Sequence, residues 1–185
     1  MGHGTAEAEK ERIRREIRMI ARATDPAALR EASRTITDRV LALPSWKKAR
    51  TVMAFVSMPE EPDTRELMET ALREGKTLLL PRCVDRVCMK ALPVKNLADL
   101  VPGILGIPEP PEPEETVPVP EPDLILVPCM AAAPQGIRLG HGAGYYDRFL
   151  AEHQGETVCL CFRVFLRADL PADETDVPTD LVITD

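Results

Sequence analysis

The stretch TVMAFVSMPEEPDTRELMETALREGKTLLLP, residues 51–81, combines two kinds of local pattern. Its ends, TVMAFVS at 51–57 and TLLLP at 77–81, are apolar runs of strand length. Between them, PDTRELMETALREGK at 62–76 has the amphipathic spacing of a helix and ends at Gly75. A strand, a helix and a second strand in this order predict a parallel crossover.

The same alternation continues along the rest of the chain. Apolar runs at 123–128 and 157–162 predict further strands, and YYDRFLAEH at 145–153 predicts a helix between them. RVCMKAL at 86–92 and DLVITD at 180–185 are candidate strands as well. This order predicts an α/β fold, namely a three-layer α/β/α sandwich with a mainly parallel central sheet.

Two helices are expected before the first strand. Residues 7–23 carry isoleucines at helical spacing and follow a short segment, 1–6, that we expect to be a loose end. The second helix starts behind Asp25, with Pro26 in its first turn, and stops at Pro44. The first quarter of the chain is therefore predicted to be a helical pair.

A proline-rich and acidic stretch, IPEPPEPEETVPVPEP, occupies residues 107–122. Its prolines exclude a helix and a central strand, so we expect an extended surface loop. Its composition is typical of a linker, but the segment after it is too short to form a separate core comfortably. With 185 residues in all, the chain is predicted to be one domain, 1–185.

The overall composition limits the class of function. A net charge of −7 disfavours a protein that mainly binds nucleic acid or an anionic membrane, because both need a basic surface. No apolar run approaches the roughly 20 residues that span a bilayer, and we expect no signal sequence. The five cysteines form no CxxC pair, which favours reduced, buried thiols. We therefore expect a cytoplasmic protein with no nucleic-acid or membrane partner. A monomer is a separate expectation that composition does not decide.

The most unusual segment is RLGHGAGYYDR, residues 138–148, between a predicted strand and a predicted helix. In open α/β sheets, ligands bind outside the carboxyl ends of the strands. Gly140, Gly142 and Gly144 would let backbone N–H groups approach a phosphate closely, beside a helix N-terminus. The segment lacks the Gly-Lys-Ser/Thr of a P-loop, and a dinucleotide fingerprint would need glycine in place of Tyr145. Spacing alone leaves two interpretations open, a phosphate-binding loop and a glycine-rich turn with two core tyrosines.

Charged residues favour the phosphate-binding interpretation. Arg138 and Arg148 flank the loop, and Asp147 could hold a Mg²⁺ ion that bridges phosphates. In the first helix, Lys10 and Arg14 fall on the apolar side, whereas the neighbouring arginines fall on the opposite side. These two cations either extend along the edge of the core or reach a phosphate site under the helix.

Taken together, Lys10, Arg14, RLGHGAGYYDR and DVPTD at 176–180 make the chain resemble the 5-formyltetrahydrofolate cyclo-ligase family. The resemblance runs nearly end to end, and the glycine segment is its most specific part. Further matching segments are 57–61, Asp63 and Thr64, LPR at 80–82, GIPEP at 106–110 and PDLILVP at 122–128.

The resemblance implies an enzyme that uses ATP and Mg²⁺ to convert 5-formyltetrahydrofolate to 5,10-methenyltetrahydrofolate, with release of ADP and phosphate. In such enzymes ATP phosphorylates the formyl oxygen, N10 attacks the activated carbon, and phosphate leaves as the ring closes. Phosphoryl transfer asks a protein mainly for positioning and charge neutralisation, so no Ser or Cys nucleophile is required. The implied fold is a CoA transferase-like α/β/α sandwich.

The resemblance also implies roles for individual residues. Those implied to bind ATP are Lys10, Arg14, Arg138, Leu139, Gly140, His141, Gly142, Ala143, Gly144, Tyr145 and Tyr146. Those implied to bind the folate are Val56, Glu61, His141, Gly142, Ala143, Gly144 and Tyr145. Arg138 and Tyr145 are implied as catalytic residues, and Asp147 and Asp176 as Mg²⁺ ligands. A carboxylate such as Glu61 can accept hydrogen bonds from pterin N–H groups.

Some positions depart from the pattern of the family. Ala143 stands where some members have lysine, so a phosphate contact from that side chain is absent. Ala132 or Ala133 replaces a usual aromatic residue, which would widen the pocket, and Phe165 replaces a common glutamine. His141 occupies a variable position, where it is either an exposed loop histidine or a phosphate donor.

Two other functions fit part of the pattern. A paralogous ATP-dependent ligase with a different second substrate would keep the loop, but loss of Glu61 or Asp147 would have favoured it, and neither is lost. A non-catalytic sensor of a nucleotide or phosphorylated metabolite needs an output element, and the sequence shows no DNA-binding module or basic stripe. The ATP-dependent cyclo-ligase is therefore the predicted function.

Overall fold

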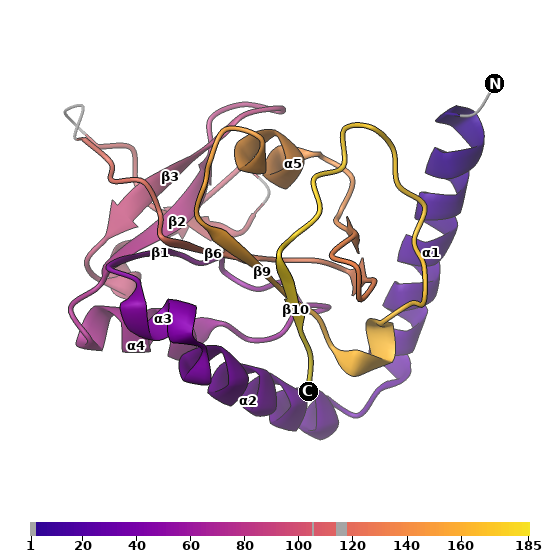
Figure 1. The fold of residues 1–185 in the computed structure, drawn as a ribbon, viewed down its shortest axis with the longest axis horizontal. Coiled ribbons are helices and arrows are strands. Elements are labelled where there is room, and N and C mark those ends of the chain that lie inside the picture. Colours follow the sequence, from indigo (N-terminus) through magenta and orange to yellow (C-terminus); the bar gives the residue numbers. More distant parts are fainter. Residues whose placement is uncertain (1–2, 105, 114–117) are drawn as a thin grey trace.

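The computed structural model of this chain describes residues 3–104, 106–113 and 118–185 (Figure 1). Its α-helices are α1 (His3–Ala23), α2 (Pro26–Ala42), α3 (Pro44–Lys48), α4 (Arg65–Arg73) and α5 (Tyr145–Leu150). Its strands are β1 (Thr51–Met53), β2 (Thr77–Cys83), β3 (Met89–Val94), β4 (Val101–Pro102), β5 (Pro108–Glu109), β6 (Leu124–Val127), β7 (Ala131–Ala132), β8 (Arg138–Leu139), β9 (Glu156–Leu160) and β10 (Leu181–Ile183). Short 3-10 helices are η1 (Leu97–Asp99) and η2 (Arg163–Phe165).

Six of the described strands form the central sheet, in the order β10-β9-β6-β1-β2-β3. Neighbouring strands from β10 to β2 pair in parallel, and β3 pairs with β2 in the antiparallel direction. The predicted crossover is confirmed, because β1 and β2 pair in parallel with Thr51 opposite Thr77, and α4 connects them. β1 is shorter than expected and ends at Met53, after which the chain enters a loop.

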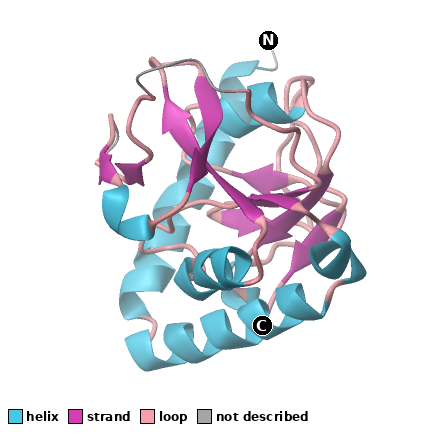
Figure 2. Ribbon diagram, turned by 90° about the vertical axis from the view of Figure 1, so that its left-hand side faces the viewer, coloured by secondary structure: helices cyan, strands magenta, loops and turns pink. Residues whose placement is uncertain are grey.

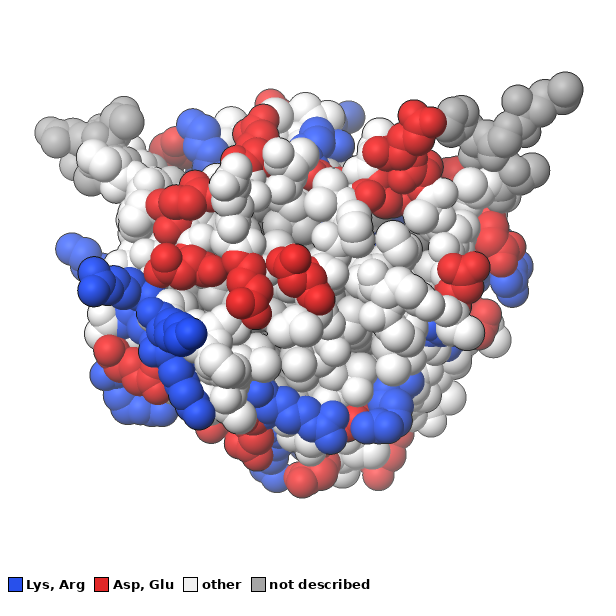
Figure 3. Space-filling view, in the orientation of Figure 1, with Lys and Arg blue, Asp and Glu red and all other residues white. Residues whose placement is uncertain are grey.

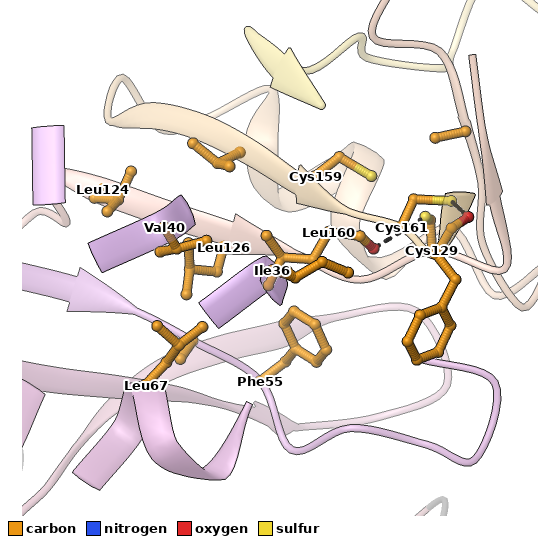
Figure 4. Close-up of a cluster of buried hydrophobic side chains, with 14 of the residues drawn as sticks. Ile36, Val40, Phe55, Leu67, Leu124, Leu126, Cys129, Cys159, Leu160 and Cys161 are labelled. Atoms are coloured by element: carbon orange, nitrogen blue, oxygen red, sulfur yellow. Dashed lines mark hydrogen bonds between the residues drawn. The ribbon is translucent and has the colours of Figure 1, made fainter. Parts of the chain in front are cut away.

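The two faces of the sheet are covered unequally. On one face, shown in Figure 4, Ile36 and Val40 of α2 and Leu67 of α4 pack in one cluster with Leu124 and Leu126 of β6. Each of these side chains is at most 1% exposed, and burial of each stabilises the fold by roughly 2 kcal/mol.

The other face carries a thinner layer. Phe149 and Leu150 of α5 pack on Met53, Ile125 and Val127, which point to this side because alternate strand residues face opposite ways. Figures 1 and 2 show α5 on one side of the sheet, with α2, α3 and α4 on the other. The predicted three-layer α/β/α arrangement is confirmed, with a third layer that contains one short helix among the described residues.

Helix α1 stands apart from these layers, near the carboxyl ends of β6 and β9 (Figure 1). Ile13 and Ile17 are buried on its inner side, and Lys10 and Arg14 are buried there too, at 7% and 5% exposed. Arg12, on the opposite side, is exposed. The helix therefore carries two cations on its inner side, as its pattern predicted.

The structure adds helix at both ends of the predicted helical pair. α1 begins at His3, so the prediction of a loose end over 1–6 is wrong from residue 3 onward, and residues 1–2 lie outside the described residues. Alanine and glutamate in the segment TAEAEKER favour helix and extend it. Pro44, where the second helix was predicted to stop, is also the first residue of α3. Trp46 of α3 is buried.

The proline-rich segment is mostly the exposed loop that was predicted, although residues 114–117 lie outside the described residues. At its start, Pro108 and Glu109 pair with Val101 and Pro102 as β5. Glu109 is only 4% exposed, so the segment begins inside the fold rather than on its surface.

The remaining expectations concern thiols and surface charge. All five cysteines are free, and all except Cys88 are buried, as predicted. Across the described residues, no helix is both long enough and apolar enough to cross a membrane. Figure 3 shows acidic side chains grouped near the middle of one face, in keeping with the net charge of −7.

Candidate active site

A cavity of about 310 Å³ lies between α1, the glycine segment, the loop after β1 and the loop before β10. It brings together all of the residues that the resemblance implied for the site. They are Lys10, Arg14, Val56, Glu61, Arg138, Leu139, Gly140, His141, Gly142, Ala143, Gly144, Tyr145, Tyr146, Asp147 and Asp176. We call this space the main cavity.

The glycine segment leaves β8 and enters α5 through a loop that needs glycine twice. Gly142 and Gly144 have φ values of 100° and 67°, in the left-handed region that other residues rarely adopt. Between Gly140 and Gly144, none of the backbone N–H groups donates a hydrogen bond to another described residue. His141, Gly142 and Ala143 are exposed and Gly140 and Gly144 are partly buried, so this run of free donors is open to solvent and suits an anion.

Arg14 lies directly under this loop. Its Nε donates to the carbonyl oxygen of Gly140 at 3.0 Å, and its Nη1 donates to Glu7 at 2.9 Å. A Cβ atom at Gly142 would come within 3.3 Å of the Arg14 guanidinium carbon. Arg14 therefore supports the backbone of the loop as well as adding positive charge below it.

Lys10 links α1 to the loop before β10. Its Nζ lies 2.6 Å from Asp176 and 2.9 Å from Asp173. Burial alone would lower the pKa of Lys10, but the hydrogen bonds to Asp176 and Asp173 outweigh it and raise that pKa. The pKa of Asp173 is held below its usual range, first by the Thr175 hydroxyl and then by Lys10.

A second pair of charges lies at the start of α5. Arg138 Nη2 donates to Asp147 Oδ1 at 2.8 Å, and the same oxygen accepts from the Val177 N–H at 3.1 Å. Arg138 Nη1 donates to the carbonyl of Val177. Since Val177 directly follows Asp176, this contact brings Asp147 and Asp176 to the same part of the main cavity.

Glu61 lies elsewhere in the main cavity, in a loop that follows β1. One carboxyl oxygen accepts from the Met58 N–H at 2.8 Å, and the other lies 3.6 Å from His141 Nδ1. Burial raises the pKa of Glu61 to about 7, against the opposing effect of the Met58 hydrogen bond. Burial also lowers the pKa of His141. Both shifts favour the uncharged form of the side chain near pH 7.

The two tyrosines have different surroundings. The Tyr145 hydroxyl donates to the carbonyl of Asp85 at 2.6 Å, so it is already engaged with the β2–β3 loop. The Tyr146 hydroxyl is buried and has no hydrogen-bond partner among the described residues. Burial raises the pKa of Tyr146 far above its usual range, which keeps this hydroxyl a donor. Tyr146 is therefore ready to donate to a ligand in the main cavity.

The carboxylates of Asp147 and Asp176 fit a Mg²⁺ ion that arrives with a nucleotide. Mg²⁺ is commonly bound by one or two carboxylates together with substrate phosphates. In the described structure, no hydrogen bond engages Asp147 Oδ2 or Asp176 Oδ1, which leaves one oxygen on each side chain. No group of three or more His, Cys, Asp or Glu side chains that could hold a metal occurs in the described residues, so the protein alone offers an incomplete set.

The sequence analysis did not single out some residues near the site, and it identified departures from the family pattern that the structure can place. Asp173 was not singled out, although its spacing from Asp176 in DETD was a signal for a shared partner. Cys83 and Met89, on β2 and β3, also line the main cavity, and no motif marked them. Ala132, Ala133 and Phe165 are buried in the core and do not line the main cavity. These three substitutions therefore change packing and not the walls of the site.

Comparisons with known proteins identify the family of this chain. Residues 6–185 match the model of the 5-formyltetrahydrofolate cyclo-ligase family. A probable 5-formyltetrahydrofolate cyclo-ligase of Schizosaccharomyces pombe is 30% identical over 167 residues, which cover 81% of this chain and 82% of that protein. The 5-formyltetrahydrofolate cyclo-ligase of Escherichia coli K12 is 31% identical over 174 residues, 91% of this chain and 96% of that protein.

A solved structure shows the same architecture. The 5,10-methenyltetrahydrofolate synthetase of Aquifex aeolicus superposes with a TM-score of 0.81 at 30% sequence identity. The alignment covers 94% of this chain and 88% of that structure. A family match over nearly the whole chain, together with relatives of this identity and coverage, leads to one conclusion. The chain belongs to the 5-formyltetrahydrofolate cyclo-ligase family.

Proposed function

We propose that this protein converts 5-formyltetrahydrofolate to 5,10-methenyltetrahydrofolate with ATP in the main cavity. One observation carries the proposal: a run of unpartnered backbone N–H groups, from Gly140 to Gly144, shares one cavity with buried cations and with Glu61. Free N–H donors and cations suit phosphates, whereas a buried carboxyl group suits a pterin. The two ends of the main cavity therefore suit two different ligands.

The phosphates of ATP are proposed to lie over the glycine segment. The N–H groups of the loop would donate to phosphate oxygens, and Arg14 and Arg138 would balance their charge from below. Lys10 is paired with two aspartates and would be shared with the nucleotide. These contacts position the terminal phosphate without a covalent bond to the protein.

Mg²⁺ would be held by Asp147 and Asp176 together with the nucleotide. When bound, it would neutralise charge that develops on the transferred phosphoryl group. Asp147 has a second task that needs no metal, because it holds Arg138 and the Val177 N–H in place.

The folate is proposed to bind near Glu61 and Val56. The Glu61 carboxyl group would accept hydrogen bonds from pterin N–H groups, and its fixed contact with the Met58 N–H orients it. Tyr146 offers a buried hydroxyl without a partner among the described residues, which can donate to an oxygen of either substrate. Residues 141–145 border both substrates and keep them in line.

The chemistry would then proceed in two steps. The formyl oxygen attacks the terminal phosphorus of ATP, an O–P bond forms and ADP leaves. N10 next attacks the formyl carbon and gives up its proton, the ring closes and the C–O bond breaks, so the oxygen departs in inorganic phosphate. The protein supplies position and charge, and no side-chain nucleophile is needed.

A single domain over 1–185, a monomeric state and a cytoplasmic location stay predictions.

The test is an absorbance assay for the methenyl product with purified protein and 5-formyltetrahydrofolate. We expect methenyl product when ATP and Mg²⁺ are both present, with one phosphate released per turnover. We expect no methenyl product when ATP is omitted. Chelation of divalent cations should stop the reaction, and added Mg²⁺ should restore it. Tight ATP binding without product would contradict the proposed second substrate.

A further inference from the structure

Arg148, in the last turn of α5, makes two contacts that the proposed chemistry has not used. Its Nη2 donates to the carbonyl oxygen of Ala143 at 2.5 Å, and its Nε donates to that of Val87 at 2.6 Å. One guanidinium group thus joins the end of the glycine segment to the β2–β3 loop, residues 84–88. Charge-assisted hydrogen bonds from a planar fork fix geometry as well as adding energy.

The contact with Ala143 sets the direction of the next N–H group. The peptide bond between Ala143 and Gly144 is trans, and in a trans peptide the C=O and N–H groups point in opposite directions. Arg148 lines a second cavity beside β3 and α5, whereas Gly144 lines the main cavity. A carbonyl held on the Arg148 side therefore turns the Gly144 N–H toward the main cavity.

The other end of the loop is also held by an arginine, but Arg14 itself lines the main cavity, whereas Arg148 does not. Arg14 holds the carbonyl of Gly140, and the His141 N–H of that peptide then points the other way. The glycine at position 144 is needed for this geometry, because a Cβ atom there would lie 2.6 Å from Arg148 Nη1. Two arginines from different helices thus each fix one carbonyl of the loop, that of Gly140 and that of Ala143.

The second partner of Arg148 is itself fixed. The Asp85 carboxylate accepts from the N–H groups of Val87 and Cys88 at 2.7 and 2.8 Å, which closes the 84–88 turn on itself. Tyr145 ties the same turn to α5 through the carbonyl of Asp85. Arg148 is therefore held between this hydrogen-bonded turn and the loop that it orients.

We propose that Arg148 is a positioning residue of the proposed reaction: it clamps the carbonyl of Ala143 against the 84–88 turn and so aims the Gly144 N–H at a phosphate of ATP. The inference rests on the proposed function for the identity of the anion. Arg148 acts through the backbone and makes no contact with the nucleotide itself.

The test compares Arg148→Ala, Arg148→Lys and a control, Arg39→Ala. Arg39 is an exposed arginine of α2 that also donates to a backbone carbonyl, that of Thr184, and it does not line the main cavity. The measurements are ATP affinity by calorimetry without folate, KM for each substrate, kcat and the melting temperature.

We expect Arg148→Ala to weaken ATP binding about tenfold and to leave the KM for 5-formyltetrahydrofolate within about twofold. Arg148→Lys keeps the charge but cannot reproduce the fork to two carbonyls, so it should weaken ATP binding almost as much. Arg39→Ala should bind ATP as the unchanged protein does.

Three results would overturn the proposal: full ATP affinity in Arg148→Lys, equal weakening of both substrates, or unchanged ATP affinity in Arg148→Ala. If Arg148→Ala does not fold, Arg148→Lys decides alone, since an effect of charge predicts normal affinity and a clamp predicts loss. If the unchanged protein binds ATP but forms no methenyl product, the proposed function fails, and the calorimetric comparison still decides the role of Arg148. No ATP binding by the unchanged protein would overturn both.

Discussion

The two ends of the main cavity treat charge in opposite ways: the end around Lys10 and Arg138, proposed for phosphates and called the phosphate end, and the end around Glu61. At the phosphate end, Lys10 lies 2.6 Å from Asp176 and Arg138 lies 2.8 Å from Asp147, so buried cations are paired with carboxylates. At the other end, Glu61 is buried with an N–H donor from Met58, and its other oxygen lies 3.6 Å from His141.

This difference is consistent with the two ligands proposed for the two ends. Paired charges can exchange a partner for a metal or a phosphate without leaving a buried charge uncompensated, which would be costly. Glu61 instead keeps a carboxyl group poised near neutral pH, at a cost in stability, and this suits hydrogen bonds from an uncharged heterocycle. The comparison predicts different outcomes when each end is altered.

The largest effect should follow removal of the charge on Asp147. Asp147→Asn keeps an oxygen that can accept from Arg138 and from the Val177 N–H, but it loses the negative charge proposed to hold Mg²⁺. We expect kcat to fall about a thousandfold, because charge stabilisation in phosphoryl transfer is lost. Steady-state kinetics at saturating ATP and Mg²⁺ measure this.

The matched control is Asp169→Asn, since Asp169 is an exposed aspartate that does not line the main cavity. It should retain normal activity. Activity of Asp147→Asn within tenfold of the unchanged protein would contradict a metal role for Asp147.

The next largest effect concerns stability at the Glu61 end. Below about pH 4.5 the Glu61 carboxyl is protonated in both folded and unfolded chains; as pH rises toward 7, the unfolded chain ionises first and the fold is destabilised. Glu61→Gln cannot ionise. It should therefore raise the free energy of unfolding by about 3 kcal/mol at pH 8 and leave it nearly unchanged at pH 4.5.

Urea unfolding at several pH values measures this difference, and binding measurements on the same variant test its role. Glu61→Gln should weaken folate binding more than ATP binding. A stability difference that stays constant from pH 5 to pH 8 would show that Glu61 does not carry a raised pKa.

The sequence was more informative about the phosphate end than about the Glu61 end, for a physical reason. Lys10 and Arg14 reveal themselves by helical periodicity, and the glycines of 138–148 by their unusual spacing, because both signals are local. The contacts of Glu61 are set by the path of a loop after β1, which no periodicity fixes. The resemblance to a family, not a pattern, pointed to Glu61.

The fold shows the same division. The strand–helix–strand pattern at 51–81 predicted the parallel pairing of β1 and β2, because local propensity and burial agree there. The sequence did not reveal that Pro44 opens a new helix or that Glu109 is buried at the start of a proline-rich loop. Both depend on tertiary packing, around Trp46 and against Gly103 respectively, and local propensity does not encode such contacts.

A smaller effect is expected at Lys10. Lys10→Met removes the cation shared by Asp173 and Asp176 and leaves two carboxylates that repel a nucleotide. We expect kcat/KM for ATP to fall about thirtyfold, with a smaller change in KM for the folate. Lys76→Met is the control, because Lys76 is a lysine that donates to the carbonyls of Trp46 and Ala49, away from the main cavity. The control should lower stability without a change in KM for ATP, and a common loss in both variants would contradict the assignment of Lys10.

The smallest effect should come from His141, which belongs to the glycine segment by sequence but to the Glu61 end by contact. Its Nδ1 faces Glu61 at 3.6 Å, and burial lowers its pKa, so at pH 7.5 it adds no full positive charge to the phosphate site. His141→Gln keeps a polar group of similar reach and should raise KM for the folate about threefold, while KM for ATP stays within about twofold. If KM for ATP rises instead, His141 acts as a hydrogen-bond donor to a phosphate. His141 then belongs to the phosphate end of the main cavity and not to the Glu61 end.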